Sequence, residues 1–395
     1  MVLFMRRSFQ FFVLFLLVLS MLGCSALSGL FGSRGGVDLS APKELQEFTP
    51  TFSVEENWSR DIGDGSEEVF PISIPEIVDN VIYVADRKGD IHAIDQDTGR
   101  VNWSVDSKQT ITGAVGVGGD LVLIGTDTGQ VHAFDRANGE FKWKVQLASQ
   151  VLSAPATNGE QVVAVTQDGK IYGLNGEDGS QIWLADVNLP LLTLYGNSTP
   201  IVFDDIAFMG LDNGKAAAFR LADGARLWEV RVGIPEGKND LERMVDIDGQ
   251  LLYHNGNLYA ASFQSGVMAI NPQAGRGLWF QEGSIQNSPG AWGGTLVVTQ
   301  DDGVVKAFNA NDGTELWTSE EFKFRNLNSP ALTSDYVAFA DFEGYLHLLS
   351  RRTGKLIGRE RVARDGVRTP TIIDGDKIYI LSNTGKLSSH TISEI

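Results

Sequence analysis

The chain has 395 residues, of which 43% are hydrophobic and 21% are charged. Its formal net charge is −18 at pH 7, and such an acidic chain repels nucleic acid and anionic lipid head groups. These values exclude nucleic-acid binding and membrane attachment through surface charge. The length and the apolar content are sufficient for an ample hydrophobic core.

The first 24 residues differ from the rest of the chain. Two arginines are followed by an almost continuously apolar run, residues 9–19. This run is shorter than the roughly 20 residues that span a bilayer core, so it predicts a secretory signal peptide over residues 1–23. The ending Met21-Leu-Gly-Cys24 resembles a bacterial lipobox, in which the cysteine is acylated and becomes the mature N terminus.

Cys24 is the only cysteine, so the chain forms no internal disulfide and the fold must be stabilised by burial. An alternative is a stray cysteine in an ordinary cleavable signal peptide. Ser25 after the cysteine resembles the pattern of lipoproteins that are sorted to the outer membrane. We therefore expect a lipid-anchored protein on the periplasmic face of the outer membrane, with a flexible tether over residues 24–48 and a folded domain over residues 49–395.

A short phrase recurs through the folded part. In its first copy, Ala93 and Asp95 are followed by Gly99 and Trp103, and six copies align on the glycine and the tryptophan. A seventh copy has Gly358 where the tryptophan would be. The spacing of about 40 to 50 residues is typical of a solenoid or a propeller. Short alternating β-branched runs flank each copy, which favours a propeller, with the tryptophan ring packed between neighbouring blades.

A second pattern counts the same units independently. A strand, a turn that ends in glycine and a second strand occur eight times. Another short strand is expected before most of these hairpins, for example at residues 152–157, 285–292, 327–333 and 367–373. Four strands in each of eight units predict an all-β, eight-bladed propeller of four-stranded antiparallel blades. The hairpin glycines are Gly89, Gly129, Gly169, Gly214, Gly266, Gly303, Gly344 and Gly385.

The ends of the folded part predict how the ring closes. The last hairpin, residues 378–392, has no fourth strand after it, whereas a strand around Trp58 precedes the first hairpin. We therefore expect the N-terminal strand to complete the last blade, which would hide two open edges. Trp292 is the only tryptophan outside this scheme. The structural tryptophans are Trp58, Trp103, Trp143, Trp183, Trp228, Trp279 and Trp317.

Catalytic and metal-binding patterns are absent from the sequence. Three histidines, His92, His132 and His347, lie at the same repeat position, which strand packing explains. His254 and His390 have no partner at ligand spacing. Neither a zinc-protease motif nor a nucleophile elbow occurs. The sequence predicts no catalytic residue, no metal and no cofactor.

The repeat phrase from Ala93 to Trp103 resembles the tryptophan-docking repeat of pyrroloquinoline-quinone propellers. With Cys24, the eightfold count and the segment Leu189–Gly196, the chain resembles the lipoprotein propeller family of the outer-membrane β-barrel assembly machinery, the Bam complex. The resemblance implies a non-enzymatic scaffold that binds the periplasmic POTRA domains of the central barrel subunit, BamA. It also implies assistance to the folding and insertion of outer-membrane proteins, with nascent outer-membrane proteins as further partners. The contact residues that it implies are Leu192, Leu194, Tyr195, Asp246 and Asp248.

The residues themselves leave alternatives at these positions. The family usually has arginine where this chain has Tyr195, and Leu191–Leu194 is also compatible with a buried strand. Asp246 and Asp248 alternate on one face of an expected strand, where carboxylates without a nearby base should stay exposed. Residues 233–243 lengthen their repeat, and insertions on propellers usually lie on a binding face.

A quinoprotein dehydrogenase is the alternative function for such a propeller. Dehydrogenases of this kind resemble one another in a calcium-bound quinone over the channel, commonly with a vicinal cysteine pair beneath it. This chain has a single cysteine. We therefore expect a scaffold and not an enzyme.

Overall fold

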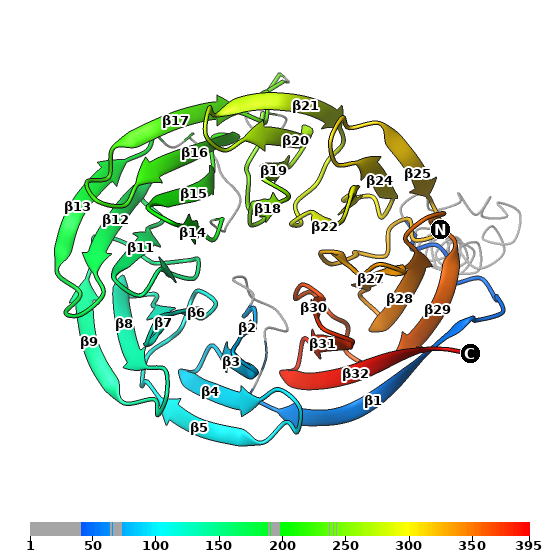
Figure 1. Cartoon of the computed structure of the whole chain (residues 1–395), viewed down its shortest axis with the longest axis horizontal. Coiled ribbons are helices and arrows are strands. Elements are labelled where there is room, and N and C mark those ends of the chain that lie inside the picture. The colour runs from blue at the N-terminus through cyan, green and yellow to red at the C-terminus, as the bar shows by residue number, and fades with distance from the viewer. Residues whose placement is uncertain are drawn as a thin grey trace, which may run out of the picture. The chain divides into compact units, whose positions relative to one another are not determined.

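Eight four-stranded antiparallel sheets are arranged as the blades of a propeller in the computed structural model (Figure 1). The structure describes residues 41–63, 65, 73–188, 190, 198–236, 238–239, 241 and 243–395. Residues 42–395 form one compact unit. Among the described residues, no helix is long and apolar enough to cross a membrane. The predicted fold class is confirmed.

Within each blade the four strands lie side by side, with the first strand nearest the centre of the ring and the fourth at the rim (Figure 1). The first strands are β2 (Glu76–Val78), β6 (Gly116–Gly118), β10 (Ala156–Thr157), β14 (Ile201–Phe203), β18 (Leu252–His254), β22 (Gly290–Trp292), β26 (Ala331–Leu332) and β30 (Ile372–Asp374). The second strands are β3 (Val81–Ala85), β7 (Leu121–Gly125), β11 (Gln161–Val165), β15 (Ile206–Leu211), β19 (Asn257–Ser262), β23 (Thr295–Thr299), β27 (Tyr336–Ala340) and β31 (Lys377–Leu381).

The third and fourth strands complete the blades, and the fourth strands form the rim in Figure 1. The third strands are β4 (Asp90–Asp95), β8 (Gln130–Asp135), β12 (Lys170–Asn175), β16 (Lys215–Arg220), β20 (Gly266–Asn271), β24 (Val305–Asn309), β28 (Tyr345–Ser350) and β32 (Lys386–Glu394). The fourth strands are β5 (Val101–Asp106), β9 (Phe141–Gln146), β13 (Gln181–Asp186), β17 (Arg226–Arg231), β21 (Arg276–Glu282), β25 (Glu315–Ser319), β29 (Leu356–Arg361) and β1 (Phe52–Asp61).

Strand direction defines two faces of the ring. Because neighbouring strands are antiparallel, the turns between second and third strands lie on the same face as the connections from one blade to the next. We call this the connection face. The turns between first and second strands, and between third and fourth strands, lie on the opposite face. Blades are numbered from blade 1, β2–β5, to blade 8, which contains β30–β32 and β1.

The repeat phrase joins each blade to the next through its glycine and its tryptophan. Gly99 has a φ of 67°, and a Cβ atom there would lie 2.6 Å from the Trp58 ring of the preceding blade. The Trp58 indole N–H donates a 3.2 Å hydrogen bond to the Gln96 carbonyl in the same turn. The glycine therefore permits both the left-handed turn and the close approach of the ring. The equivalent tryptophan–glycine pairs are Trp103–Gly139, Trp143–Gly179, Trp183–Gly224, Trp228–Gly275, Trp279–Gly313 and Trp317–Gly354.

Blade 7 has Gly358 where the eighth tryptophan would lie, and the space is used by the N-terminal strand. A Cβ atom on Gly358 would lie 3.0 Å from the Phe52 carbonyl oxygen. Nearby, the Thr51 amide donates a 2.8 Å hydrogen bond to the Ile357 carbonyl. The missing tryptophan thus leaves room for the start of β1 against β29.

The ring closes as the sequence predicts. β1 pairs with β32 along its whole length, from Phe52 opposite Glu394 to Asp61 opposite Lys386, with a bulge between Glu56 and Trp58. Blade 8 therefore contains strands from both ends of the folded part (Figure 1). This pairing covers the edge of β32, which would otherwise be open.

The hydrophobic core lies between blades and is not gathered at one centre. One cluster, for example, joins Leu121 and Leu123 of blade 2 to Val162 and Leu174 of blade 3. Each pair of neighbouring blades is joined in this way, because the second and third strands are buried on both faces. Stability therefore depends on every blade having two neighbours.

The first strands are shorter than the sequence predicts. The run expected over residues 367–373 contributes only the first residues of β30 (Ile372–Asp374). Carbonyls in these runs instead accept hydrogen bonds from polar side chains of the preceding blade, as at Asn287 Nδ2 to Leu327 O (2.8 Å) and Asn328 Nδ2 to Thr369 O (2.5 Å). Because their bonding partners lie in another blade, these residues are not part of a strand ladder.

Candidate functional site

The residues expected to contact a partner are divided between two connections of the connection face. Leu192, Leu194 and Tyr195 fall between β13 and β14 and lie outside the described residues, as does Cys24. Asp246 and Asp248 fall in residues 232–251, between β17 and β18. This is the longest stretch between described strands of successive blades.

The two connections lie together at one point that the structure describes. Ser198, near the end of the first connection, donates a 3.0 Å hydrogen bond from Oγ to the Gly249 carbonyl in the second. Ser198 is buried. Both connections adjoin blade 4, one entering it and the other leaving it.

Residues 244–248 do not belong to a described strand, contrary to the expectation that the two aspartates alternate on a strand face. Ile247 is buried in the packing between blades 4 and 5, Val245 is also buried, and Asp246 is only 1% exposed. The expectation that both carboxylates stay exposed is therefore wrong. The segment is held by neighbouring groups, because Ser262 Oγ donates to the Val245 carbonyl (2.9 Å) and the Phe263 amide donates to the Asp246 carbonyl (3.0 Å).

Asp248 is the electrostatically unusual member of the pair. Burial, together with the neighbouring carboxylates of Asp246 and Asp212, raises its pKa to about 7. Its Oδ1 atom is buried and has no hydrogen-bond partner among the described residues. An ionised carboxylate without a partner is costly in such a place. The site is therefore suited to receive a cationic group, which would stabilise the ionised form.

The raised pKa predicts a pH-dependent effect of replacing this carboxylate. Asp248 is protonated in the folded state and ionised in the unfolded state between pH 4 and 7, so its contribution to stability falls as the pH rises through 7. When the pH is raised from 5 to 8, the difference in free energy of unfolding between Asp248→Asn and the parent should therefore shift by about 2 kcal/mol in favour of the variant. Urea unfolding of both proteins at the two pH values measures this difference.

Glu76 provides a matched control, because it is a second carboxyl group whose pKa is raised by burial and it lies in a different blade. It lies on β2, accepts a 3.0 Å hydrogen bond from the Val117 amide, and has a pKa raised to about 7 by burial. Glu76→Gln should show the same sign of pH dependence, although it lies in blade 1. A pH-independent difference for Asp248→Asn would show that this carboxylate is ordinary and would contradict the electrostatic account.

Groups suited to metal binding do not gather in the described part of the chain. No cluster of three or more histidine, cysteine, aspartate or glutamate side chains there could hold a metal ion. His132 and His347 are buried in the packing of their blades, and the His92 ring contacts the Ile62 carbonyl at 3.2 Å. Strand packing accounts for the shared repeat position of these histidines.

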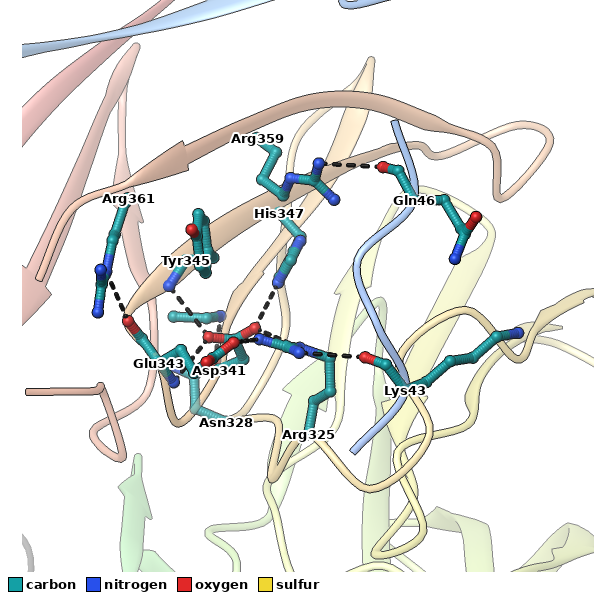
Figure 2. Close-up of polar contacts among 11 residues, drawn as sticks. Lys43, Gln46, Arg325, Asn328, Asp341, Glu343, Tyr345, His347, Arg359 and Arg361 are labelled. Atoms are coloured by element: carbon teal, nitrogen blue, oxygen red, sulfur yellow. Dashed lines mark hydrogen bonds and ion pairs between the residues drawn. The ribbon is translucent and has the colours of Figure 1, made fainter. Parts of the chain in front are cut away.

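A buried ion-pair cluster on blade 7 was not anticipated from the sequence. Arg325, with a side chain 3% exposed, donates from Nε to Asp341 Oδ2 at 2.7 Å and also pairs with Glu343 (Figure 2). His347 Nε2 contacts the same Asp341 oxygen at 2.9 Å. Burial alone would raise the pKa of Asp341, but the bonds from His347 and Arg325 hold it below its usual range. The sequence carries no distinctive signal for this cluster, because arginines also precede the hairpins of blades 5 and 8, at Arg243 and Arg368.

The N-terminal segment is bound to this cluster. Arg325 Nη1 donates to the Lys43 carbonyl at 3.1 Å, and Arg359 Nη2 donates to the Gln46 carbonyl at 3.0 Å (Figure 2). The Arg359 guanidinium also lies over the Phe48 ring. Part of the segment predicted as a tether, residues 43–48, therefore packs against blade 7.

Comparison with known proteins identifies the family. The model of the family described as outer membrane protein assembly factor BamB matches residues 87–287 and 267–394. A Pseudomonas aeruginosa protein of that name is 45% identical over 376 residues, which cover 95% of this chain and 97% of that protein. The Salmonella typhimurium protein is 32% identical over 382 residues, covering 93% and 95%.

Solved structures agree with this result. The crystal structure of BamB from Moraxella catarrhalis has a TM-score of 0.78 and 25% identity, covering 86% of this chain and all of that one. A quinohemoprotein alcohol dehydrogenase from Comamonas testosteroni has a TM-score of 0.66 at 12% identity, covering 86% and 76%, and this shows a shared fold alone. The chain belongs to the BamB family of outer membrane protein assembly factors.

Proposed function

We propose that the chain is a lipid-anchored, non-enzymatic scaffold of the outer-membrane β-barrel assembly complex. It binds the periplasmic POTRA domains of BamA and assists the folding and insertion of outer-membrane proteins. The observation that carries this proposal is the 45% identity over 95% of the chain to a protein named outer membrane protein assembly factor BamB.

The docking surface in this proposal is the pair of connections beside blade 4. Leu192, Leu194 and Tyr195 supply apolar and aromatic side chains from the first connection, and Asp248 supplies a carboxylate from the second. The bond between Ser198 and Gly249 supports their proximity. An apolar anchor beside a charged group is typical of protein interfaces, in which the anchor contributes most of the affinity.

Asp246 and Asp248 have different roles in this surface. Asp246 is buried and packs with Ile247 between blades, so it acts by holding the segment in place. The half-buried Asp248 meets a lysine or an arginine of the partner, because an incoming cation would stabilise its ionised form. Binding should then release a proton near neutral pH and strengthen as the pH rises from 6 to 8.

Removal of the apolar anchor is the direct test of the docking surface. Leu192→Ala with Leu194→Ala should weaken binding to the isolated POTRA domains at least tenfold, which corresponds to about 1.4 kcal/mol. Asp248→Asn should weaken binding further and reduce its dependence on salt and pH. Isothermal titration calorimetry at two salt concentrations and two pH values measures both effects.

A matched leucine pair controls for the general loss of apolar surface. Leu227 and Leu278 are 44% and 41% exposed on the rim strands β17 and β21, away from both connections. Leu227→Ala with Leu278→Ala should leave POTRA binding unchanged. Unaltered binding of the Leu192 and Leu194 variant, with a native Tm, would reject this surface. An early-melting variant would show that the two leucines are core residues instead.

The lipid anchor at Cys24 is tested separately from the docking surface. Cys24 is the only possible acylation site in the sequence, so Cys24→Ser should move the protein from the membrane fraction to the soluble periplasm. Fractionation should be done in cells that lack BamA, so that partner binding does not retain the variant. A variant that still sediments with membranes under these conditions would contradict the lipoprotein assignment.

A further inference from the structure

The rim of blade 7 is basic, although the chain as a whole has a net charge of −18. Residues 351–364, which comprise the turn before the rim strand β29, the strand itself and the residues after it, contain six basic residues and one acidic residue. The equivalent residues of blade 6, 310–323, contain one basic and four acidic residues. Blade 2, at residues 136–149, has three basic residues and one acidic residue. The net charge of the whole chain therefore hides a local basic surface.

Five basic side chains of this run are at least partly accessible, and we call them the basic rim. Four are exposed and Arg359 is half-buried. Within the described part of the chain, none of the five belongs to an ion pair, whereas Lys142 and Arg226 on the rims of blades 2 and 4 pair with carboxylates. The positive charge of the basic rim is therefore not neutralised by ion pairs of its own. Its members are Arg352, Lys355, Arg359, Arg361 and Arg364.

The basic rim follows the outermost strand of the blade from end to end. Arg359 and Arg361 lie on one side of β29, and their guanidinium groups are 5.9 and 5.6 Å from the centre of the Tyr345 ring (Figure 2). Arg361 Nη2 also donates a 3.3 Å hydrogen bond to the Arg364 carbonyl. Arg352 and Lys355 lie in the turn before the strand. A strand of this length extends about 20 Å, so one flat surface can contact both of its ends.

Carboxylates near the basic rim offset only part of its charge. Glu343 already pairs with Arg325. Glu360 alternates with Arg359 and Arg361 along β29, so its side chain lies on the other side of the blade. The N-terminal segment adds two exposed glutamates, Glu44 and Glu47. Basic side chains remain in excess along the rim.

The N-terminal segment packs against this same surface. Arg359, a member of the basic rim, donates to the Gln46 carbonyl and lies over the Phe48 ring. The Lys43 amide donates a 2.9 Å hydrogen bond to the Lys323 carbonyl, close to Arg325 in the chain. Cys24, the proposed lipidation site, precedes Lys43 by 19 residues. The chain that leads to the proposed lipid anchor is therefore attached to the blade with the most basic rim.

We propose that the basic rim of blade 7 lies on an anionic membrane surface and binds the phosphate groups of lipid head groups. Arginine and lysine side chains are attracted to such a surface, and the attraction falls off within a Debye length. The acidic remainder of the ring is repelled, so the ring stands edge-on with blade 7 toward the lipid. The choice of a lipid surface over an acidic protein rests on the proposed lipid anchor.

The anchor and the basic rim have separate roles in this proposal. Charge alone does not hold so acidic a chain on a membrane at physiological salt, so release of the Cys24→Ser variant is still expected. The anchor keeps the rim at a high effective concentration near the lipid, and the rim then sets the orientation. Blade 4 lies three blades from blade 7, so this orientation leaves the proposed docking surface open to POTRA domains.

Sedimentation with vesicles tests the proposal on the unlipidated Cys24→Ser chain at low ionic strength. We expect binding to vesicles of phosphatidylglycerol mixed with phosphatidylcholine, and none to phosphatidylcholine alone. Combined Arg352→Gln, Lys355→Gln and Arg364→Gln should weaken binding at least tenfold. These three side chains make no hydrogen bond to a described residue, so the variant should keep a native Tm. Raised salt should weaken binding of the parent chain.

A matched variant removes the same net charge elsewhere. Arg100, Lys144 and Arg276 are exposed in the corresponding turns or rim strands of blades 1, 2 and 5. Their combined replacement by glutamine should leave vesicle binding within about twofold of the parent, because these residues lie far around the ring from blade 7. An equal loss in both variants would show that only net charge matters and would overturn the proposal, as would equal binding of the parent and the rim variant.

Two competitors distinguish a lipid surface from other anionic partners. Inorganic phosphate should displace the vesicles no better than chloride of equal ionic strength. Stronger displacement by phosphate would assign the rim to a discrete phosphate site and overturn the proposal. Polyglutamate that binds the parent more tightly than the vesicles do would assign the rim to an acidic protein, with the same consequence.

POTRA binding measured on the same variants separates this proposal from the proposed function. The rim variant should bind POTRA domains as the parent does, and the Leu192 and Leu194 variant should bind vesicles normally. Because the vesicle assay uses a chain without lipid, its result does not depend on whether Cys24 is acylated. Failure of the docking surface or of the anchor would therefore leave the result for the basic rim unaffected.

Discussion

A chain that begins at Ile62 is expected to lose more than about 5 kcal/mol in free energy of unfolding relative to a chain that begins at Pro50. The shorter chain lacks all of β1, whose Trp58 and Phe52 pack against the cores beside blades 1 and 7. Truncation of one large buried aromatic side chain alone costs about 3 kcal/mol or more. The edge of β32 would also be left open to pairing with other chains.

Thermal melting followed by circular dichroism and light scattering measures this effect. Three chains are compared, which begin at Pro42, Pro50 and Ile62. The Pro50 chain lacks the Lys43, Gln46 and Phe48 contacts but keeps all of β1. Removal of residues 42–49 should lower the free energy of unfolding far less than the further removal of β1. A synthetic peptide of residues 50–61 should restore the Tm of the shortest chain in a concentration-dependent manner, since it binds only the folded state. Equal Tm values for the Pro50 and Ile62 chains would refute closure by β1.

Asp341→Ala is expected to cost about 3–5 kcal/mol, because it leaves Arg325 buried without its carboxylate partner. The same carboxylate also accepts 3.0 Å hydrogen bonds from the Glu343 and Tyr345 amides. Since the pKa of Asp341 is held below its usual range, this stabilisation is present at neutral pH and is lost as the pH falls through the folded pKa. Because the folded pKa lies below the ordinary value of 3.8, urea unfolding at pH 7 and at a pH of about 2 tests both the size and the sign.

Asp86 is a matched control at the equivalent place in blade 1. Its Oδ1 atom accepts hydrogen bonds from the Gly89 and Asp90 amides at 3.0 and 2.9 Å, but no arginine pairs with it among the described residues. Asp86→Ala should therefore cost only about 1–2 kcal/mol. Replacement of both charges, as Arg325→Met with Asp341→Leu, should also cost less than Asp341→Ala. Equal costs for Asp341→Ala and Asp86→Ala would show that Arg325 is not dependent on this carboxylate.

The blade 7 cluster has a consequence for the proposed anchor. Its bonds to the Lys43 and Gln46 carbonyls attach the N-terminal segment to one blade. In the lipid-anchored protein that we propose, the chain would therefore leave the propeller at blade 7. The tether available between Cys24 and the propeller would be correspondingly shorter than the predicted span of residues 24–48.

Much of the fold was determined by local sequence. The phrase from Gly99 to Trp103 repeats because each glycine must receive the tryptophan of the preceding blade, so its period counts the blades directly. Turn chemistry at the hairpin glycines counts them a second time. The position of Trp58 before the first hairpin even predicts closure, because a strand with a docking tryptophan needs a neighbouring blade.

The electrostatic features and surfaces were decided only by the tertiary structure, because they depend on which blades become neighbours. The alternation of Asp246 with Asp248 predicted an exposed side chain, but Asp246 is buried because the connection folds between blades 4 and 5. Phe203 and Tyr253 are 50 residues apart and stack only because β14 and β18 belong to adjacent blades. Local pattern fixes what each repeat becomes; contacts between repeats determine which of its side chains are buried, charged or available to a partner.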